Sequence, residues 1–148
     1  MIDAREVSFF TAAQLIVRKI SGAAIGPEAR RITIEWRYDR TDPWAIRMHM
    51  PALEAEYRFA RELLDRGRIE PTGADGRVFV QPLLSQWVEI TLRCNCRKCP
   101  AFLFSFDHSE IDNVIDATEL LVPLGAEADQ VDEAAVDAEL ARIASGAA

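Results

Sequence analysis

Apolar and polar residues alternate along two adjacent stretches of the chain, residues 31–38 and 44–50. The apolar positions are Ile32, Ile34, Trp36, Tyr38, Trp44, Ile46, Met48 and Met50. A period of two predicts two β-strands, each with one buried face and one face in water. Pro43 fixes its own φ and favours an extended residue before it, so a turn is predicted at Asp42-Pro43. On this phase Trp36 and Trp44 are both predicted to pack in the core.

Five further segments have strand character. An apolar, partly β-branched run over 7–20 indicates a strand or a pair of strands, although Ala12-Ala13-Gln14 would also suit a helix. Shorter strands are predicted at about 54–59, 77–81, 86–93 and 101–106. Trp87 is out of phase with the apolar positions of its own strand, which are Val88, Ile90 and Leu92. We therefore expect Trp87 to be exposed and to be a candidate contact for a protein partner.

A short helix is predicted at about 60–66, with Gly67 as the C′ residue that ends it. A longer helix is predicted from residues at helical spacing, which are Ile111, Val114, Ile115 and Thr118. Its start is predicted at Asp107, or at a capping box formed by Ser109 and Asp112. Its end is expected at Leu121 or Val122, because Pro123 follows.

The last 21 residues, 128–148, are predicted to form an acidic C-terminal helix after a body of about 7–127. The fold class is therefore predicted as α+β, with about seven antiparallel strands packed with two to three helices. A length of 148 residues is that of one domain, so the whole chain is expected to be a single domain.

The composition of the chain indicates the cellular compartment in which the protein is expected. No apolar run approaches the roughly 18–20 residues needed to span a bilayer. The first six residues lack the basic flank and long apolar core of a signal peptide. Three cysteines are an odd number for a disulfide framework, which is typical of a reducing compartment. The chain is therefore expected to be cytoplasmic.

Charge is unevenly distributed along the chain. Residues 1–106 hold 16 Lys/Arg and 13 Asp/Glu, whereas residues 107–148 hold one Lys/Arg and 11 Asp/Glu. Proteins that bind a nucleic-acid duplex usually display a pronounced basic face, so nucleic acid is an unlikely partner. The acidic end either keeps the protein soluble as a solvated helix or docks against a protein or the body.

Candidate chemistry is concentrated in Cys94, Cys96 and Cys99, at a predicted hairpin tip. The Cys96 and Cys99 thiolates have the spacing of a zinc knuckle. Zinc would need a fourth ligand from His49, His108, water or another subunit. Two alternatives stay open: reduced thiols without a role, and a redox-responsive disulfide between Cys96 and Cys99. The sequence contains no phosphate-binding loop, nucleophile elbow or zinc-protease motif, so no active site is recognised and no cofactor beyond a possible zinc is expected.

Several motifs in order carry a resemblance to a known family. They are Asp42-Pro43-Trp44-Ala45-Ile46, Phe59-Ala60-Arg61-Glu62-Leu63-Leu64, Pro71-Thr72-Gly73, Thr118-Glu119-Leu120-Leu121-Val122-Pro123-Leu124-Gly125-Ala126-Glu127 and Val136-Asp137-Ala138-Glu139-Leu140-Ala141-Arg142-Ile143. Each motif alone is ordinary, but their order and spacing over about 7–145 resemble the SsgA-like regulators of sporulation and cell division in mycelial actinobacteria, the SsgB branch included.

The resemblance implies a non-enzymatic regulator with a Whirly-like fold that assembles as a trimer. Its expected partner is the division GTPase FtsZ, or a sister regulator, at the division septum. Exposed residues of the strands and of the 60–66 helix are expected to contact this partner, with Arg61 and Arg66 as candidates beside Trp87. One alternative is binding of single-stranded nucleic acid on a Whirly-like sheet. The other is a metal- or redox-responsive regulator acting through the three cysteines.

Overall fold

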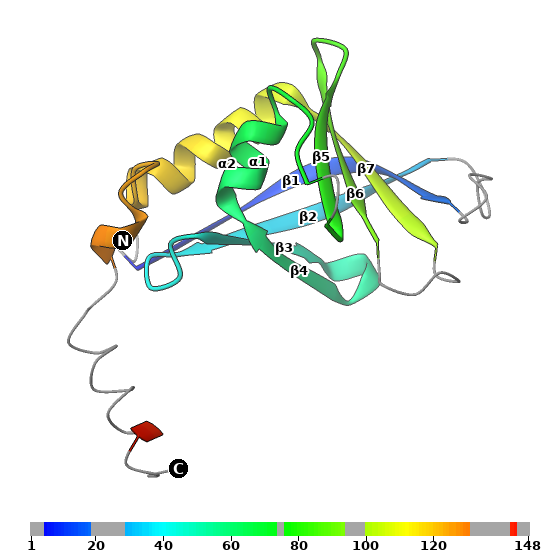
Figure 1. The fold of residues 1–148 in the computed structure, drawn as a ribbon. Helices are drawn as coiled ribbons and strands as arrows, with labels where there is room; N and C mark the ends of the chain where they lie inside the picture. The colour runs from blue at the N-terminus through cyan, green and yellow to red at the C-terminus, as the bar shows by residue number, and fades with distance from the viewer. Residues whose placement is uncertain (1–4, 19–28, 74–75, 94–99, 131–142, 145–148) are drawn as a thin grey trace.

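The computed structural model describes residues 5–18, 29–73, 76–93, 100–130 and 143–144. Seven antiparallel strands form one sheet in the order β4-β3-β2-β1-β7-β6-β5, and the helices pack against one face of it (Figure 1). The strands are β1 (Glu6–Arg18), β2 (Arg30–Asp39), β3 (Ala45–Met50), β4 (Ala55–Ala60), β5 (Val78–Leu83), β6 (Trp87–Leu92) and β7 (Ala101–Asp107). The helices are α1 (Arg61–Gly67), α2 (His108–Leu121) and the short 3₁₀ segments η1 (Pro51–Leu53) and η2 (Glu127–Gln130). The predicted α+β class is confirmed, with a single sheet.

Strand β1 joins the two halves of the sheet. The segment predicted as a strand or a pair is one strand of 13 residues. It pairs with β2 from Glu6 to Leu15, but with β7 only from Gln14 to Arg18. Within the described residues, the first half of β1 therefore has no strand partner on its β7 side. Strand β7 diverges from β1 there, stays paired with β6 up to Asp107 and then continues into α2.

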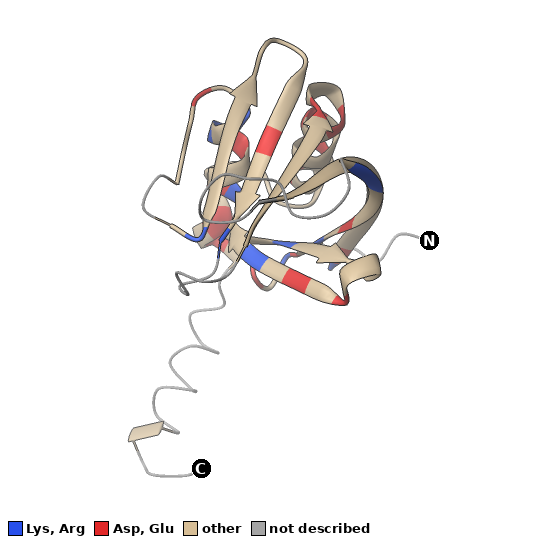
Figure 2. Ribbon diagram, turned by 90° about the vertical axis from the view of Figure 1, so that its right-hand side faces the viewer, with Lys and Arg blue, Asp and Glu red and all other residues tan. Residues whose placement is uncertain are grey.

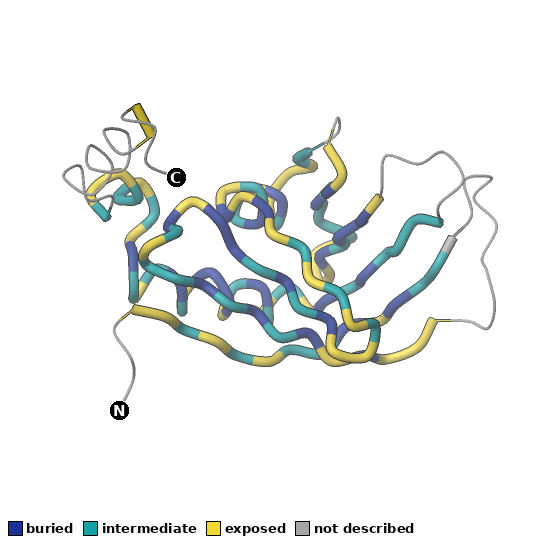
Figure 3. Tube along the Cα trace, turned by 90° about the horizontal axis from the view of Figure 1, so that it is seen from below, coloured by how far each residue is buried: buried dark blue, intermediate teal, exposed yellow. Residues whose placement is uncertain are grey.

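The core lies between the sheet and the helices, and buried positions alternate with exposed ones along the strands (Figure 3). Trp36 lies at its centre with its ring 5.6 Å from that of Phe106, and the indole Nε1–H donates to Thr11 Oγ1 at 2.9 Å. Helix α2 buries the four residues that its periodicity predicted, which are Ile111, Val114, Ile115 and Thr118. The period of two and the helical period both identify the core positions because each element has one dry face.

Trp44 is not part of the core, so the prediction that it packs there is wrong. Its side chain is 53% exposed, whereas Trp36 is fully buried. Strand β3 begins only at Ala45, so Trp44 belongs to the turn and the alternation that includes Ile46 does not reach it. Arg58 bonds to Asp42 in the same turn, at 2.7 and 2.8 Å.

Two helix ends also differ from the prediction. Gly67 is the last residue of α1 rather than its C′ residue, and a Cβ there would overlap the side chain of Val80. The glycine therefore permits close packing of α1 on β5. Helix α2 begins after Asp107 without a side-chain cap, and the predicted capping box is wrong because Asp112 instead accepts bonds from Arg68. Most of the predicted acidic C-terminal helix lies outside the described residues.

Candidate functional site

Trp87 lies at the start of β6, between Leu83 of β5 and Asp107 of β7. Its side chain is 36% exposed, while its neighbour Val88 is completely buried. The phase break in the sequence therefore predicted the exposure of Trp87 correctly. Its role as a partner contact stays a prediction.

The loop that joins β5 and β6 carries a second exposed apolar side chain. Leu84 is 87% exposed and has a φ of 55°, in the left-handed region. A residue with a Cβ loses roughly 1–2 kcal/mol in that conformation. The β5–β6 hairpin projects beyond the rest of the sheet (Figure 1), so Leu84 is presented at its tip. Leu84 could not be identified from the sequence, since only the turn conformation distinguishes it from other apolar residues.

A pocket of about 120 Å³ lies beside Trp87. It forms where β1 has no β7 partner before Gln14 and β7 turns into α2. Its lining includes Ala12, Gln14, Arg31, Trp87, Ser105, Asp107 and Glu110. The pocket thus joins an aromatic surface to two carboxylates, neither of which was predicted as a binding residue.

Glu110 is the half-buried carboxylate of this pocket. Burial raises its pKa above the usual value, and the nearby charge of Asp107 raises it further. The backbone N–H of Ala12 donates to Glu110 and opposes this rise, as does the charge of Arg31. The net direction is upward, so the pocket disfavours two ionised carboxylates and would favour an added cation.

Arg61 is not exposed, and the prediction that it presents a surface to a partner is wrong in this respect. Its side chain is completely buried at the start of α1. Nη1 donates to the carbonyl oxygen of Val122 at 2.6 Å, and Nη2 donates to Glu127 Oε1 at 2.5 Å. The guanidinium also lies 4.8 Å from the ring centre of Tyr38. Arg61 therefore holds the segment that follows α2 against the body.

Tyr38 forms the other wall of this arginine site. Its hydroxyl donates to the carbonyl oxygen of Pro43 at 2.7 Å, and burial raises its pKa to about 12 although the charge of Arg61 opposes the rise. A neutral ring face is what a guanidinium stacks on. Nothing in the sequence indicated that Arg61 is buried, because arginine is usually a surface residue.

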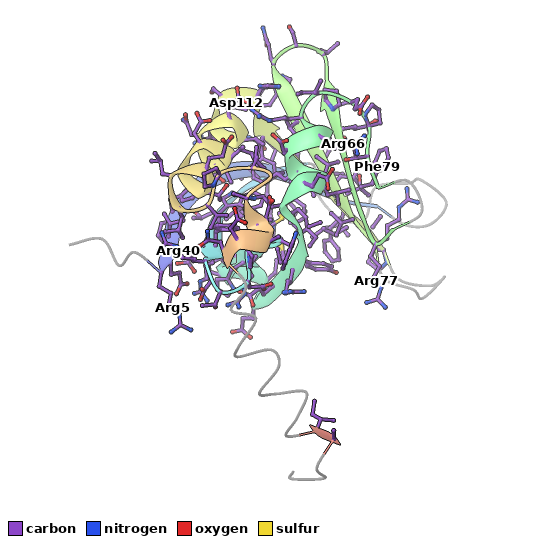
Figure 4. All side chains as sticks on the ribbon, turned by 60° about the vertical axis from the view of Figure 1, so that its left-hand side comes forward. Arg5, Arg40, Arg66, Arg77, Phe79 and Asp112 are labelled. Atoms are coloured by element: carbon purple, nitrogen blue, oxygen red, sulfur yellow. The ribbon has the colours of Figure 1, made fainter. Side chains whose placement is uncertain are left out.

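Arg66 is exposed on α1, as predicted (Figure 4). It pairs with Glu62 at 3.5 Å and with Glu70 at 3.3 Å, each four residues away along the chain. Exposed pairs of this kind contribute only a few tenths of a kcal/mol. Basic and acidic positions are interspersed over the described ribbon (Figure 2), and Arg66 itself lies among acidic neighbours.

Cys94, Cys96 and Cys99 lie outside the described residues, so the predicted zinc or redox site stays a prediction. Elsewhere, over the described ranges, no group of three or more His, Cys, Asp or Glu side chains is placed to hold a metal ion. His108 bonds through Nδ1 to Asp112 at 3.1 Å and through Nε2 to the carbonyl oxygen of Arg68 at 2.9 Å. Both ring nitrogens of His108 are therefore already engaged.

None of the described helices combines the length and the apolar character required to cross a membrane. Helix α2, the longer of the two α-helices described, has 14 residues and carries acidic side chains along it.

Comparison with known proteins gives the same family at three levels. A family model described as "Streptomyces sporulation and cell division protein, SsgA" matches residues 32–127. The chain is 35% identical over 138 residues to the sporulation-specific cell division protein SsgB of Frankia casuarinae, a match that covers 90% of this chain and 91% of that protein.

Two solved structures are similar throughout. An SsgA-like sporulation-specific cell division protein of Thermobifida fusca has a TM-score of 0.66 at 27% identity, covering 96% of this chain and 98% of that one. SsgB of Streptomyces coelicolor, whose mutations correlate to longitudinal cell division during sporulation, has a TM-score of 0.63 at 26% identity, covering 85% and 97%. The chain belongs to the SsgA family of sporulation and cell division proteins.

Proposed function

We propose that this chain is a non-enzymatic adaptor of sporulation-specific division that positions the FtsZ machinery at septum sites in the cytoplasm. The observation that carries the proposal is the projecting β5–β6 hairpin, which presents Leu84 and Trp87 to solvent in a family of division proteins. Exposed large apolar side chains gathered on one hairpin mark a candidate protein-binding surface, and tryptophan is enriched among the residues that contribute most to such interfaces.

Assembly would add to the strength of such a surface. A homotrimer, which the family resemblance suggests, would offer three equal copies of the hairpin to a polymer. Each contact could then be weak, because linking the sites raises the effective concentration of the second and third contact. This arrangement suits a regulator that binds a filament and is later released from it.

Co-sedimentation with FtsZ polymers from the same host tests the proposal, with GTP present and absent. We expect the full chain to pellet with FtsZ only when GTP allows polymers to form. Trp87→Ser should weaken this binding about tenfold or more, as loss of a central interface tryptophan does. Trp44→Ser is the matched control, because Trp44 is also exposed but lies in the β2–β3 turn. Absence of pelleting above the FtsZ-free control would contradict a direct role and direct the search to a sister regulator.

A further inference from the structure

We propose that the hairpin tip and the pocket beside it form one docking surface for a protein segment that carries an apolar side chain next to an arginine. This tip surface consists of Leu83, Leu84, Trp87, Asp107 and Glu110. The identity of the partner as a division protein rests on the proposed function, but the chemistry of the segment rests on the surface alone.

Leu84 is the apolar part of the tip surface. Glycine or asparagine would occupy its left-handed conformation at lower cost, and the leucine side chain gains almost no burial in return, since it is 87% exposed. Residues held in such sparsely populated backbone conformations cluster at functional sites. A partner that covers Leu84 would supply the missing burial.

The charged part of the tip surface is the pair of carboxylates, Asp107 and Glu110, that line one pocket with Trp87. Over the described ranges, neither Asp107 nor Glu110 forms an ion pair, although Asp107 is close enough to disfavour ionisation of Glu110. A cation placed between them would relieve this repulsion. The surface is therefore complementary to a positive side chain.

Arginine fits this place better than lysine. Its planar guanidinium can bond two carboxylates at once and stack on an indole ring, whereas an ammonium acts as a point charge. The pocket volume of about 120 Å³ is well above the roughly 10–15 Å³ that admits one water molecule. A guanidinium entering beside Trp87 would thus have room. Trp87 links this pocket to the hairpin tip, because it pairs with Leu83, the residue before Leu84.

The charge of Arg31 should affect binding of the segment in a predictable direction. It lines the same pocket and its charge lowers the pKa of Glu110, but no ion pair between Arg31 and Glu110 occurs within the described part of the chain. Arg31 therefore weakens the attraction for an incoming cation without filling its place. Arg31→Gln should strengthen binding about two- to fivefold, the effect of one exposed charge. A purely structural role of Arg31 would not produce a gain.

The test uses the full chain, labelled with ¹⁵N, and a blocked peptide Ala-Leu-Arg-Leu-Ala, with Ala-Leu-Gln-Leu-Ala as the control peptide. The readout is the indole N–H resonance of Trp87, identified by its loss in Trp87→Phe. We expect a saturable shift with the arginine peptide and a much weaker one with the glutamine peptide. Because no FtsZ is present, this result is independent of whether the chain binds FtsZ.

Variants with matched controls locate the contact. Leu84→Asn keeps a residue that tolerates the left-handed turn and should weaken peptide binding about tenfold, as loss of one buried leucine does. Leu120→Asn removes an equally exposed leucine on α2 and should have no effect. Glu110→Gln should weaken binding about two- to fivefold, whereas Asp116→Asn, an exposed acid on the same helix, should not.

The proposal is overturned if the arginine peptide causes no shift, or if both peptides bind equally well. It is also overturned if Leu84→Asn changes the oligomeric mass and the wild-type chain ignores the peptide, since the tip would then be buried between copies. Peptide binding without FtsZ pelleting would support the tip surface and contradict the proposed function. FtsZ pelleting together with no shift by the arginine peptide would support the proposed function and contradict the tip surface.

Discussion

The two ends of helix α2 differ in how their backbone and side-chain groups are bonded. At the C-terminal end, Arg40 donates to the carbonyl oxygen of Leu121 at 3.2 Å and Arg61 donates to that of Val122. At the N-terminal end, Asp107 occupies the cap position without a side-chain cap bond, and Glu110 lines a pocket open to solvent. Arginines lie at the C-terminal end and carboxylates at the N-terminal end, so the sign of the charge at both ends agrees with the helix dipole.

The difference lies in burial and bonding rather than in the sign of the charge. Val122 is completely buried, so Arg61 is needed to keep its carbonyl from being an unsatisfied buried acceptor. The N-terminal carboxylates keep solvent contact and bond little within the body. The bonds at the C-terminal end of α2 therefore stabilise the fold, while the carboxylates at its N-terminal end stay available to bind a partner.

Replacement of Arg61 by leucine should produce the largest effect. It removes the arginine donor of the Val122 carbonyl and the cation that pairs with Glu127. Loss of one partner of a buried ion pair typically lowers the free energy of unfolding by about 3–5 kcal/mol. Urea denaturation of the full chain measures this loss. Arg66→Leu is the matched control on the same helix and should change stability by no more than about 0.5 kcal/mol. Equal effects of the two variants would show that the C-terminal end of α2 does not depend on Arg61.

Glu127→Gln should produce an intermediate effect. A hydrogen bond to a charged group contributes about 1.5–3 kcal/mol, and the amide would keep only part of it. Burial alone would raise the pKa of Glu127, but bonds from Arg61 and from backbone N–H groups lower it overall. The stabilisation is then present above the unfolded pKa of about 4.3 and is lost as the pH falls through the lower folded value.

The difference in melting temperature between wild type and Glu127→Gln should therefore be large near neutral pH and vanish in acid. Glu119→Gln, on α2, is the matched control. A difference that stays constant down to acid pH would mean that the ionised form of Glu127 is not what stabilises the segment after α2.

Much of the fold could be predicted from the sequence. Alternation identified the strands and the burial of Trp36, and helical spacing identified the dry face of α2. The wrong predictions of burial concern residues that lie outside the regular alternation of a strand or the regular spacing of a long helix. Trp44 is in a turn, so its phase carries no information about burial. Arg61 begins a short helix, and its burial depends on the return of residues 122–127, about 60 positions later in the sequence.

The candidate surface was only partly predictable. Trp87 was found because it breaks the apolar phase of its own strand. Leu84 was missed because a left-handed φ has no signature when leucine occupies it. The pocket depends on the end of the β1–β7 pairing at Gln14, a tertiary property that no local pattern encodes.

Leu84→Gly should stabilise the protein, the opposite of the usual effect of glycine. Relief of the left-handed strain at φ 55° should raise the free energy of unfolding by up to about 1 kcal/mol, reduced by the greater freedom of glycine in the unfolded chain. Ser85→Gly, next to it in the same loop, should be neutral or destabilising. Thermal denaturation of both variants measures the difference. A loss of stability in Leu84→Gly would show that the hairpin needs this leucine for folding rather than for a partner.

Glu110→Gln should have the smallest effect and a pH dependence opposite to that of Glu127→Gln. The pKa of Glu110 is raised in the folded chain by burial and by Asp107, so ionisation of Glu110 weakens the fold. This cost is absent below the unfolded pKa of about 4.3 and is fully present above the raised folded value. Because Glu110 is only half-buried, Glu110→Gln should gain about 0.5 kcal/mol or less at neutral pH and nothing in acid. Two glutamates near opposite ends of one helix would then respond to pH with opposite signs, and melting curves of both variants over the same pH series decide whether they do.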